Sequence, residues 1–383
     1  MKPLRTASTR RLLLLLSAVA ALAAAAAAIA VAASGHAGAP PPPKPLAQAL
    51  HDAATAPQPA GVTARITFAN HLLPSTAGLG QAAPALVTGA DGRLWLTGDG
   101  HGRIELQSDA GDTQIVWSPT LATVYDGSSN TLYRIALPAR KQTPEGAPPT
   151  VAQIVTLLAK LARSVTVSGA EPLVLAGRSA YAVRLSPRDT AGLLAGAGVA
   201  WDASTGAPLE IGVYARGQSA PVLELKVDDI SYGAVPAADV ELPPPAGAKV
   251  VDLSAPAGGG SGKPVSGLAA VQAALPFRLV APDALGSLQR GETLLVGRDA
   301  ALLVYGKGAG AVAVLERQAS AQPGTLPGML GALPKVTVGG ASATELATPL
   351  GTVLRYERGG VSFVVAGSLP PAEVEAAAAG LTQ

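Results

Sequence analysis

Apolar and polar residues alternate along several stretches of this chain. From residue 209 to 214 every second residue is apolar, and residues 223–228 repeat the pattern. A period of two is typical of antiparallel strands that have one apolar face. The preceding turn, residues 203–208, contains a glycine, which can take the positive φ of a tight reversal, and a proline, which fixes φ at its exit. The pattern predicts a strand ending near Asp202, a tight turn, and two further antiparallel strands.

A longer series of alternating stretches lies between residues 93 and 137. Clusters of Gly, Asp, Ser and Asn interrupt it, as is typical of successive hairpins. The predicted strands are residues 93–97, 103–107, 113–117, 121–126 and 131–137. Several of these strands carry apolar groups on both faces. A sheet covered by helices on one side only would not need this, so we expect a second apolar face that must also be covered.

Two helices are predicted beside these strands. Residues 46–56 have an apolar stripe of helical period before prolines end the helix. Thr150 and Gln153 have the spacing of a capping box, which predicts a helix from there to Arg163. Further strands are predicted at residues 64–70, 173–176 and 180–185, and residues 187–198 are expected to form a Gly-rich connection. Residues 72–89 have apolar residues without a clear period, and we expect a mobile loop or flap there.

The N-terminus has the pattern of a targeting segment. Four basic residues precede a nearly all-apolar run, residues 12–33. Positive charges stay on the cytoplasmic side, so the rest of the chain is expected outside the cytoplasm. The run is long enough for a spanning helix, which needs about 20 residues, and small residues near its end also fit a cleavage site. Residues 1–34 are therefore predicted to be either a membrane anchor or a cleaved signal peptide.

Two stretches of low complexity divide the exported part of the chain. Residues 35–45 are rich in proline and predict an extended spacer, and residues 251–264 contain a flexible Gly-Gly-Gly-Ser-Gly run. These linkers separate a larger domain, residues 46–250, from a smaller one, residues 265–383.

The smaller domain is predicted to be an α+β unit with an antiparallel sheet. Residues 294–305 and 311–315 read as strands on either side of a glycine-rich turn. Residues 352–358 and 361–366 predict a hairpin, and residues 371–379 predict a final helix.

The turn at residues 201–209 resembles that of a known group. The sequence Trp-Asp-x-x-Thr-Gly-x-Pro-Leu, followed by another strand and by Pro-Pro-Pro-x-Gly at residues 243–247, is similar to the closing strands of the LolA/LolB/RseB-like superfamily. This resemblance implies a mainly β fold with α (α+β), in which a curved antiparallel half-barrel sheet with covering helices holds the acyl chains of lipids or lipoproteins. It also implies an extracytoplasmic location. The smaller domain is loosely similar to the C-terminal domain of RseB-type proteins.

Composition excludes several classes of function. Only 14% of the residues are charged and the formal net charge is +2, so the chain has no strong positive field for nucleic acid. The absence of cysteine removes disulfides, thiolate metal sites and cysteine nucleophiles. The four histidines have no metal-ligand spacing, and neither a Walker nor a GxSxG motif occurs. We therefore predict a protein without catalytic residues, metal or cofactor.

The strands with two apolar faces predict a cavity in the larger domain. The helical segments are too few to cover the second face of so many strands. For any single aromatic residue, ordinary sheet core is the simpler interpretation, because aromatic residues favour strands. Strand alternation selects as lipid-cavity candidates Trp95, Ile104, Leu106, Ile115, Trp117, Tyr125, Tyr133, Ile135, Tyr181, Val183, Leu209, Ile211, Val213, Leu223 and Leu225.

Three functions remain open on the sequence alone. The first is a carrier of lipid or lipoprotein acyl chains, for which an ABC transporter would be a partner. The second is an RseB-like sensor that binds the exported domain of an anti-sigma factor, which the two-domain organisation favours. The third is an interaction module with a filled core.

Overall fold

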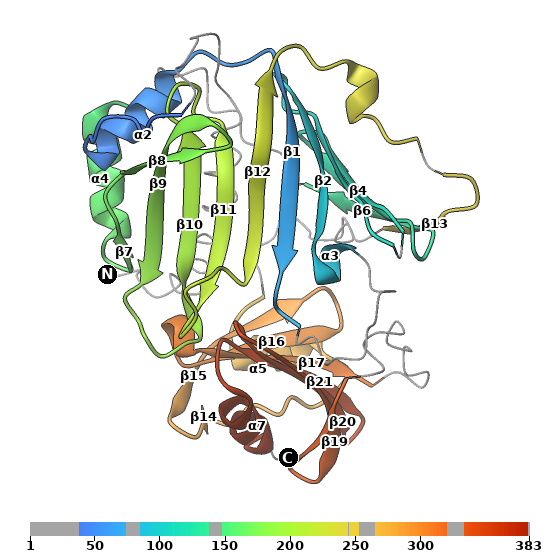
Figure 1. Cartoon of the computed structure of the whole chain (residues 1–383). Helices are drawn as coiled ribbons and strands as arrows, with labels where there is room; N and C mark the ends of the chain where they lie inside the picture. The colour runs from blue at the N-terminus through green and yellow to red at the C-terminus, as the bar shows by residue number, and fades with distance from the viewer. Residues whose placement is uncertain are drawn as a thin grey trace.

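The computed structural model describes residues 38–73, 85–109, 111–137, 148–243, 245–252, 265–319 and 333–381 of the chain. They form one sheet of 13 strands and a second sheet of 8 strands. A few helices pack against the two sheets (Figure 1). The predicted class, mainly β with α, is confirmed.

One half of the large sheet is the meander that the alternation predicts. Its strands follow one another along the chain as antiparallel neighbours. They are β1 (Gly61–Asn70), β2 (Ala90–Thr97), β3 (Gly102–Leu106), β4 (Thr113–Trp117), β5 (Leu121–Asp126) and β6 (Thr131–Ala136). Beyond β6 lies β13 (Lys249–Asp252), which is parallel to β6. This strand takes residues 251 and 252 out of the expected linker, because they pair with β6.

Later strands form the other half of the large sheet. β12 (Leu223–Tyr232) pairs with β1 and joins the halves, and β11 (Pro208–Ala215), β10 (Leu194–Asp202) and β9 (Arg178–Pro187) follow outward. β7 (Val165–Val167) and β8 (Glu171–Leu175) each pair with part of β9. In Figure 1, β9 to β12 and β1 run side by side, and the sheet then curves away through β2, β4 and β6.

Half of the Gly-rich stretch 187–198 is strand, so the expected connection is confined to residues 188–193. β9 extends to Pro187 and β10 begins at Leu194. Glycine suits β10 because the Tyr214 ring of β11 lies over it: a Cβ at Gly198 would be 3.3 Å from Tyr214 Cε2. Arg184 of β9 stacks on the same ring, with Cζ 3.7 Å from the centroid. The glycine therefore makes room for a Tyr–Arg stack.

Among the described residues, three α-helices accompany the large sheet. α2 (Leu46–Thr55) packs against α4 (Val151–Leu161). The capping box predicted for α4 is confirmed, since Thr150 Oγ1 accepts from the Gln153 amide and Gln153 Oε1 accepts from the Thr150 amide. α3 (Ala85–Thr88) contacts β1 and occupies part of the stretch expected to be a loop. Residues 74–84 of that stretch lie outside the described residues.

The small sheet has its own closed core. Its strands, in spatial order, are β14 (Ala284–Leu285), β15 (Leu288–Val296), β16 (Ala300–Tyr305), β17 (Val312–Gln318), β21 (Val361–Gly367), β20 (Gly351–Arg358), β19 (Ala341–Thr348) and β18 (Lys335–Val338). Helices α5 (Leu268–Ala274) and α7 (Pro371–Ala379) pack against it. The predicted hairpin and final helix are confirmed. Residues 294–305 are divided between β15 and β16, because a turn with Gly297 at a φ of 64° separates them.

The loop between β9 and β10 connects the two sheets. The Leu193 amide donates to the Ser368 carbonyl oxygen at 2.7 Å, and the Ala309 amide donates to Asp189 Oδ2 at 3.1 Å. These bonds hold the loop end of β10 against the small sheet, which lies below the large one in Figure 1.

Two of the predicted segments lie wholly or largely outside the described residues. Residues 12–33 and residues 253–264 lie outside the described residues, so the predicted membrane segment and most of the second linker are not seen. No helix among the described residues is long and apolar enough to cross a membrane. The end of the proline-rich spacer lies on the large sheet, where the Tyr181 hydroxyl donates to the Pro42 carbonyl oxygen at 2.6 Å and Ser179 Oγ to that of Ala39 at 2.7 Å.

Candidate functional site

Cross-strand pairing gives the large sheet two different faces. One line of paired side chains crosses five strands and consists of Val183, Val199, Ile211, Leu225 and Phe68. Neighbours along a strand point to opposite faces, so Glu210, Lys226 and Arg65 lie on the other side. We call these sides the apolar face and the charged face. The second apolar face that the sequence predicts is therefore wrong for these strands, because charged side chains occupy its positions.

The apolar face continues through the meander. A second line of paired side chains crosses β2 to β6 and consists of Leu94, Ile104, Ile115, Val124 and Tyr133. Leu94 pairs with Ala64 of β1, which is on the same face as Phe68. The two lines therefore belong to one apolar face that spans the curved sheet.

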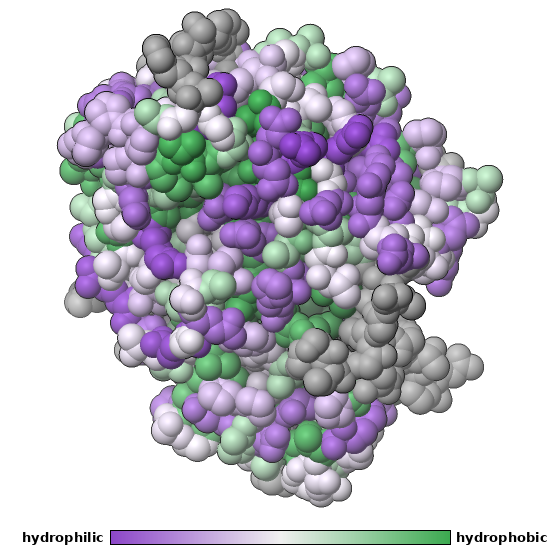
Figure 2. All heavy atoms as spheres, viewed as in Figure 1, coloured by the Kyte–Doolittle hydropathy of each residue, from purple (hydrophilic) through white to green (hydrophobic). Residues whose placement is uncertain are grey.

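The charged face is the side that Figure 2 presents. Polar side chains gather there over β12, β1 and β2. Arg65 Nε lies 3.7 Å from Asp229 Oδ2, and Arg103 Nη2 lies 2.7 Å from Glu105 Oε2. This side has the polar groups that a solvated face needs, so the opposite side is the candidate binding surface.

Most of the predicted cavity residues lie on the apolar face. They are Ile104, Leu106, Ile115, Trp117, Tyr133, Ile135, Tyr181, Val183, Ile211, Val213, Leu223 and Leu225. Leu209 is buried at a bulge between β10 and β11. The face also contains Phe68, Leu94, Val124 and Val199, which the sequence analysis missed although alternation along their strands would have selected them.

Trp95 and Tyr125 are corrections, because the register places both on the charged face. Trp95 pairs with Thr63 and Arg103, and the Arg103 guanidinium lies 5.5 Å from its ring centroid. Tyr125 pairs with Gln114, and its hydroxyl donates to Asn130 Oδ1 at 3.0 Å. Aromatic character selected these two residues, whereas their polar ends and cation contacts suit the solvated side.

The two sheets differ in how completely their apolar faces are covered. In the small sheet Leu303, Val314 and Val365 are fully buried. On the large sheet, equivalent strand-centre residues such as Ile115 and Ile211 are only half-buried. The difference arises because α5 and α7 cover an 8-stranded sheet, whereas α2 and α3 face a sheet of 13 strands.

The helices cover defined parts of the apolar face. Ala49 of α2 forms a buried cluster with Tyr181 and Trp201 at the β9–β10 end. Ala85 of α3 belongs to a second cluster around Ile66 of β1. Outside these clusters, residues of the face such as Ile115 and Ile211 are half-buried rather than fully covered.

The turn that carries the family resemblance holds a buried polar cluster. The Ser204 amide and Oγ donate to Asp202 Oδ1 at 2.8 and 2.5 Å, and Arg178 Nε and the Tyr232 hydroxyl each donate to Oδ2 at 2.8 Å. Burial alone would raise the pKa of Asp202, but the hydrogen bonds from Ser204 and Arg178 outweigh it and lower that pKa. The carboxylate is thus ionised and fully paired, which indicates a structural role.

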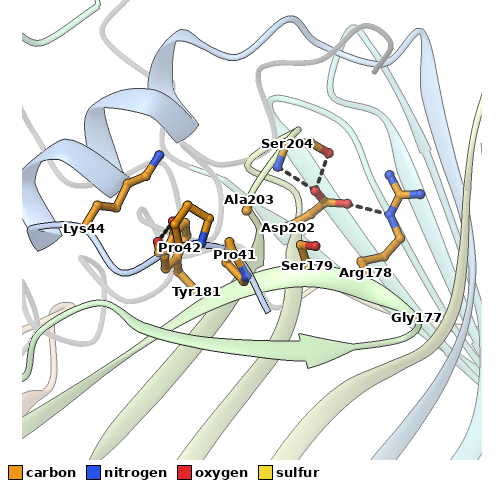
Figure 3. A pocket seen from close by; sticks show the side chains of 10 residues that line it. All are labelled: Pro41, Pro42, Lys44, Gly177, Arg178, Ser179, Tyr181, Asp202, Ala203 and Ser204. Atoms are coloured by element: carbon orange, nitrogen blue, oxygen red, sulfur yellow. Dashed lines mark hydrogen bonds and ion pairs between the residues drawn. The ribbon is translucent and has the colours of Figure 1, made fainter. Parts of the chain in front are cut away.

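Two pockets lie beside strands of the large sheet. Figure 3 shows the first, of about 250 Å³, in which Arg178 and Ser204 point to Asp202 while Lys44 and Tyr181 lie on the other side near Pro42. Lys44 is already paired with Asp52 at 2.6 Å. The second pocket, of about 370 Å³, lies between the start of β5 and residues 240–243, and Trp117 also lines it. No group of three potential metal ligands occurs among the residues that the structure describes.

Comparison with known proteins gives similarity in structure only. No protein-family model matches the chain, and no curated protein sequence matches it. A chain of the Pseudomonas aeruginosa MucA/MucB complex is similar at 16% identity and a TM-score of 0.40, covering 87% of this chain and 94% of that one. A LolA superfamily protein from Nitrosomonas europaea is similar at 12% identity and a TM-score of 0.22, covering 48% and 90%. These proteins come from the group that the sequence resemblance names, and at such scores the likeness concerns the fold alone.

Proposed function

We propose that this chain is an extracytoplasmic binding protein without catalytic activity, whose large sheet holds the acyl chains of a lipid or lipoprotein. The observation that carries the proposal is the incompletely covered apolar face beside a fully covered small-sheet core in the same molecule. Large exposed apolar surfaces are unfavourable in water and mark binding sites. An acyl chain is apolar and flexible, so it can follow a curved face.

The affinity expected of such a surface is substantial. Each methylene group removed from water contributes about 0.8 kcal/mol, so a chain of roughly ten to fifteen carbons gains about 8–12 kcal/mol before the cost of association. After that cost, a dissociation constant on the order of micromolar remains. No charged partner is needed, which agrees with the absence of Lys and Arg from the two central lines of the apolar face.

The proposed location rests on the N-terminal pattern. Basic residues followed by a long apolar run favour export, either with the segment retained as an anchor or after its cleavage. A protein held at the outer side of the cytoplasmic membrane is close to the lipids and lipoproteins that leave it. An ABC transporter would be the natural partner for their release.

The test uses one strand with two faces. Leu225→Glu puts a charge on the apolar face of β12, and Ser231→Glu puts the same charge on the charged face of β12. With both variants folded by circular dichroism, we expect Leu225→Glu to weaken binding of a fluorescent fatty acid at least tenfold and Ser231→Glu to leave it unchanged. Equal binding by the two variants would contradict the assignment of the face.

A second candidate is an RseB-like sensor that binds the exported domain of an anti-sigma factor. The small sheet favours it, because a simple carrier of acyl chains does not need a second folded unit that is fixed to the first through Asp189 and Leu193. MucB, one of the similar structures, is described in complex with MucA. Binding of such an exported domain by lipid-free protein, without uptake of a fluorescent fatty acid, would favour the sensor over the carrier.

A further inference from the structure

Glu316 places a carboxyl group inside the core of the small sheet. It lies on the same face of β17 as Val314, opposite Ala301 and Phe363, and its side chain is fully buried. Oε2 accepts a hydrogen bond from the Val280 amide at 2.9 Å, whereas Oε1 has no partner among the described residues. A buried carboxylate with one hydrogen bond is costly, so this position favours the neutral acid.

Val280 belongs to a segment that we call the strap, residues 277–283. The strap joins α5 to β14 without forming helix or strand, and it buries Leu279 and Val280 in the core. Side chains hold it in place: Gln272 Oε1 accepts from the Leu279 amide at 2.9 Å, and Arg290 Nη2 donates to Asp283 Oδ1 at 2.8 Å. Because the strap has no ladder of backbone hydrogen bonds, we expect it to open at a lower cost than the paired strands around Glu316.

The groups around Glu316 do not neutralise a negative charge there. Tyr305 of β16 and Tyr356 of β20 face it, and burial raises the pKa of each hydroxyl to about 12. The positive charge of Arg290 opposes the rise in the pKa of Tyr305, and that of Arg358 opposes the rise in the pKa of Tyr356. Neither arginine forms an ion pair with Glu316 among the described residues. Burial raises the pKa of Glu316 to about 7, and the Val280 hydrogen bond opposes this only in part.

We propose that Glu316 makes the strap a pH-dependent closure of the small sheet, held most firmly while the carboxyl group is neutral and opened more readily once the carboxylate forms. Opening exposes the carboxylate to water and so releases a proton. The opening equilibrium therefore rises with pH between the ordinary pKa of 4.5, which applies to the open form, and the pKa of about 7 of the closed form, and it levels off above. These two values give an increase of about tenfold in the opening constant from pH 6 to pH 8.

The test is amide hydrogen exchange at Leu279 and Val280 in the whole exported chain at pH 6 and pH 8, corrected for the intrinsic exchange rate. The wild type and a control, Glu357→Gln on the exposed side of β20, are expected to lose about tenfold in protection between the two pH values. Glu316→Gln is expected to show equal protection at both. Glu345, whose pKa is raised by burial and by Glu375, is present in all three proteins, so its effect cancels. Constant protection in the wild type, or the same loss in Glu316→Gln, would overturn the proposal.

A second measurement covers the case in which Glu316→Gln does not fold. Carbon-13 NMR of the wild-type carboxyl groups is expected to show one glutamate that titrates near pH 7 together with the change in strap protection. If no glutamate titrates near pH 7, the closure does not depend on Glu316.

Discussion

Tyr181 and Trp201 lie opposite each other on β9 and β10, with ring centroids 6.2 Å apart, beneath α2. The Tyr181 hydroxyl also holds the backbone of Pro42, and Lys44 Nζ lies 5.6 Å from the Tyr181 ring centroid. At this end the apolar face is therefore closed by the N-terminal helix and by the segment before it. The pair marks one boundary of the accessible surface, which extends from here toward β1 and the meander.

We expect Gly206→Ala to loosen α2. Gly206 has a φ of 72°, and a Cβ there would lie 2.7 Å from the Ala53 carbonyl oxygen of α2. Gly217 has a φ of 78° with nothing within 4 Å of a Cβ, so Gly217→Ala is the matched control for backbone strain alone. Strain costs about 1–2 kcal/mol in each variant, and the collision adds about 1–3 kcal/mol to Gly206→Ala. Urea unfolding measures the difference, and equal destabilisation would mean that α2 moves away freely.

Asp202→Asn is expected to destabilise the large sheet by roughly 3 kcal/mol at neutral pH, because it removes a buried carboxylate and leaves the half-buried Arg178 without its charged partner. The lowered pKa of Asp202 means that its stabilisation is fully present above the ordinary value of 3.8 and is lost as pH falls through the lower folded value. The difference between wild type and variant in free energy of unfolding should therefore shrink in strong acid. A difference that stays constant from pH 7 to pH 2 would show that the ionised state of Asp202 does not matter.

Limited proteolysis tests whether the two sheets belong to separable domains. The Gly- and Ser-rich composition of residues 258–263 favours first cleavage there, with fragments that correspond to the large and small sheets. The hydrogen bonds of Asp189 and Leu193 are expected to keep the fragments associated after cleavage at low salt. Resistance of residues 258–263 to cleavage while other loops are cut would contradict the division into two domains.

Local patterns account for the parts of the fold that the sequence predicts well. The bounds of β4 and β5 agree with alternation and turn residues, and Thr150 with Gln153 marks the start of α4. Pairing between strands far apart in the chain leaves no such local signal, so the pairing of β13 with β6 could not be predicted from the sequence.

The same limit applies to the candidate site. Which side of a strand belongs to the apolar face is decided by the register between strands, and this is why Trp95 and Tyr125 were assigned to the wrong face. The buried position of Glu316 could not be predicted either, because a single charged residue near the end of an alternating strand normally points to solvent.

The measurement that tests the central claim most directly is native mass spectrometry of the whole protein, purified from its own host without detergent. The account predicts a protein mass increased by bound lipid, which dissociates on collisional activation and is absent or reduced in Leu225→Glu but retained in Ser231→Glu. A protein that shows only its own mass, and that also fails to take up a fluorescent fatty acid, would contradict the acyl-chain site and favour an apolar face filled by the chain itself.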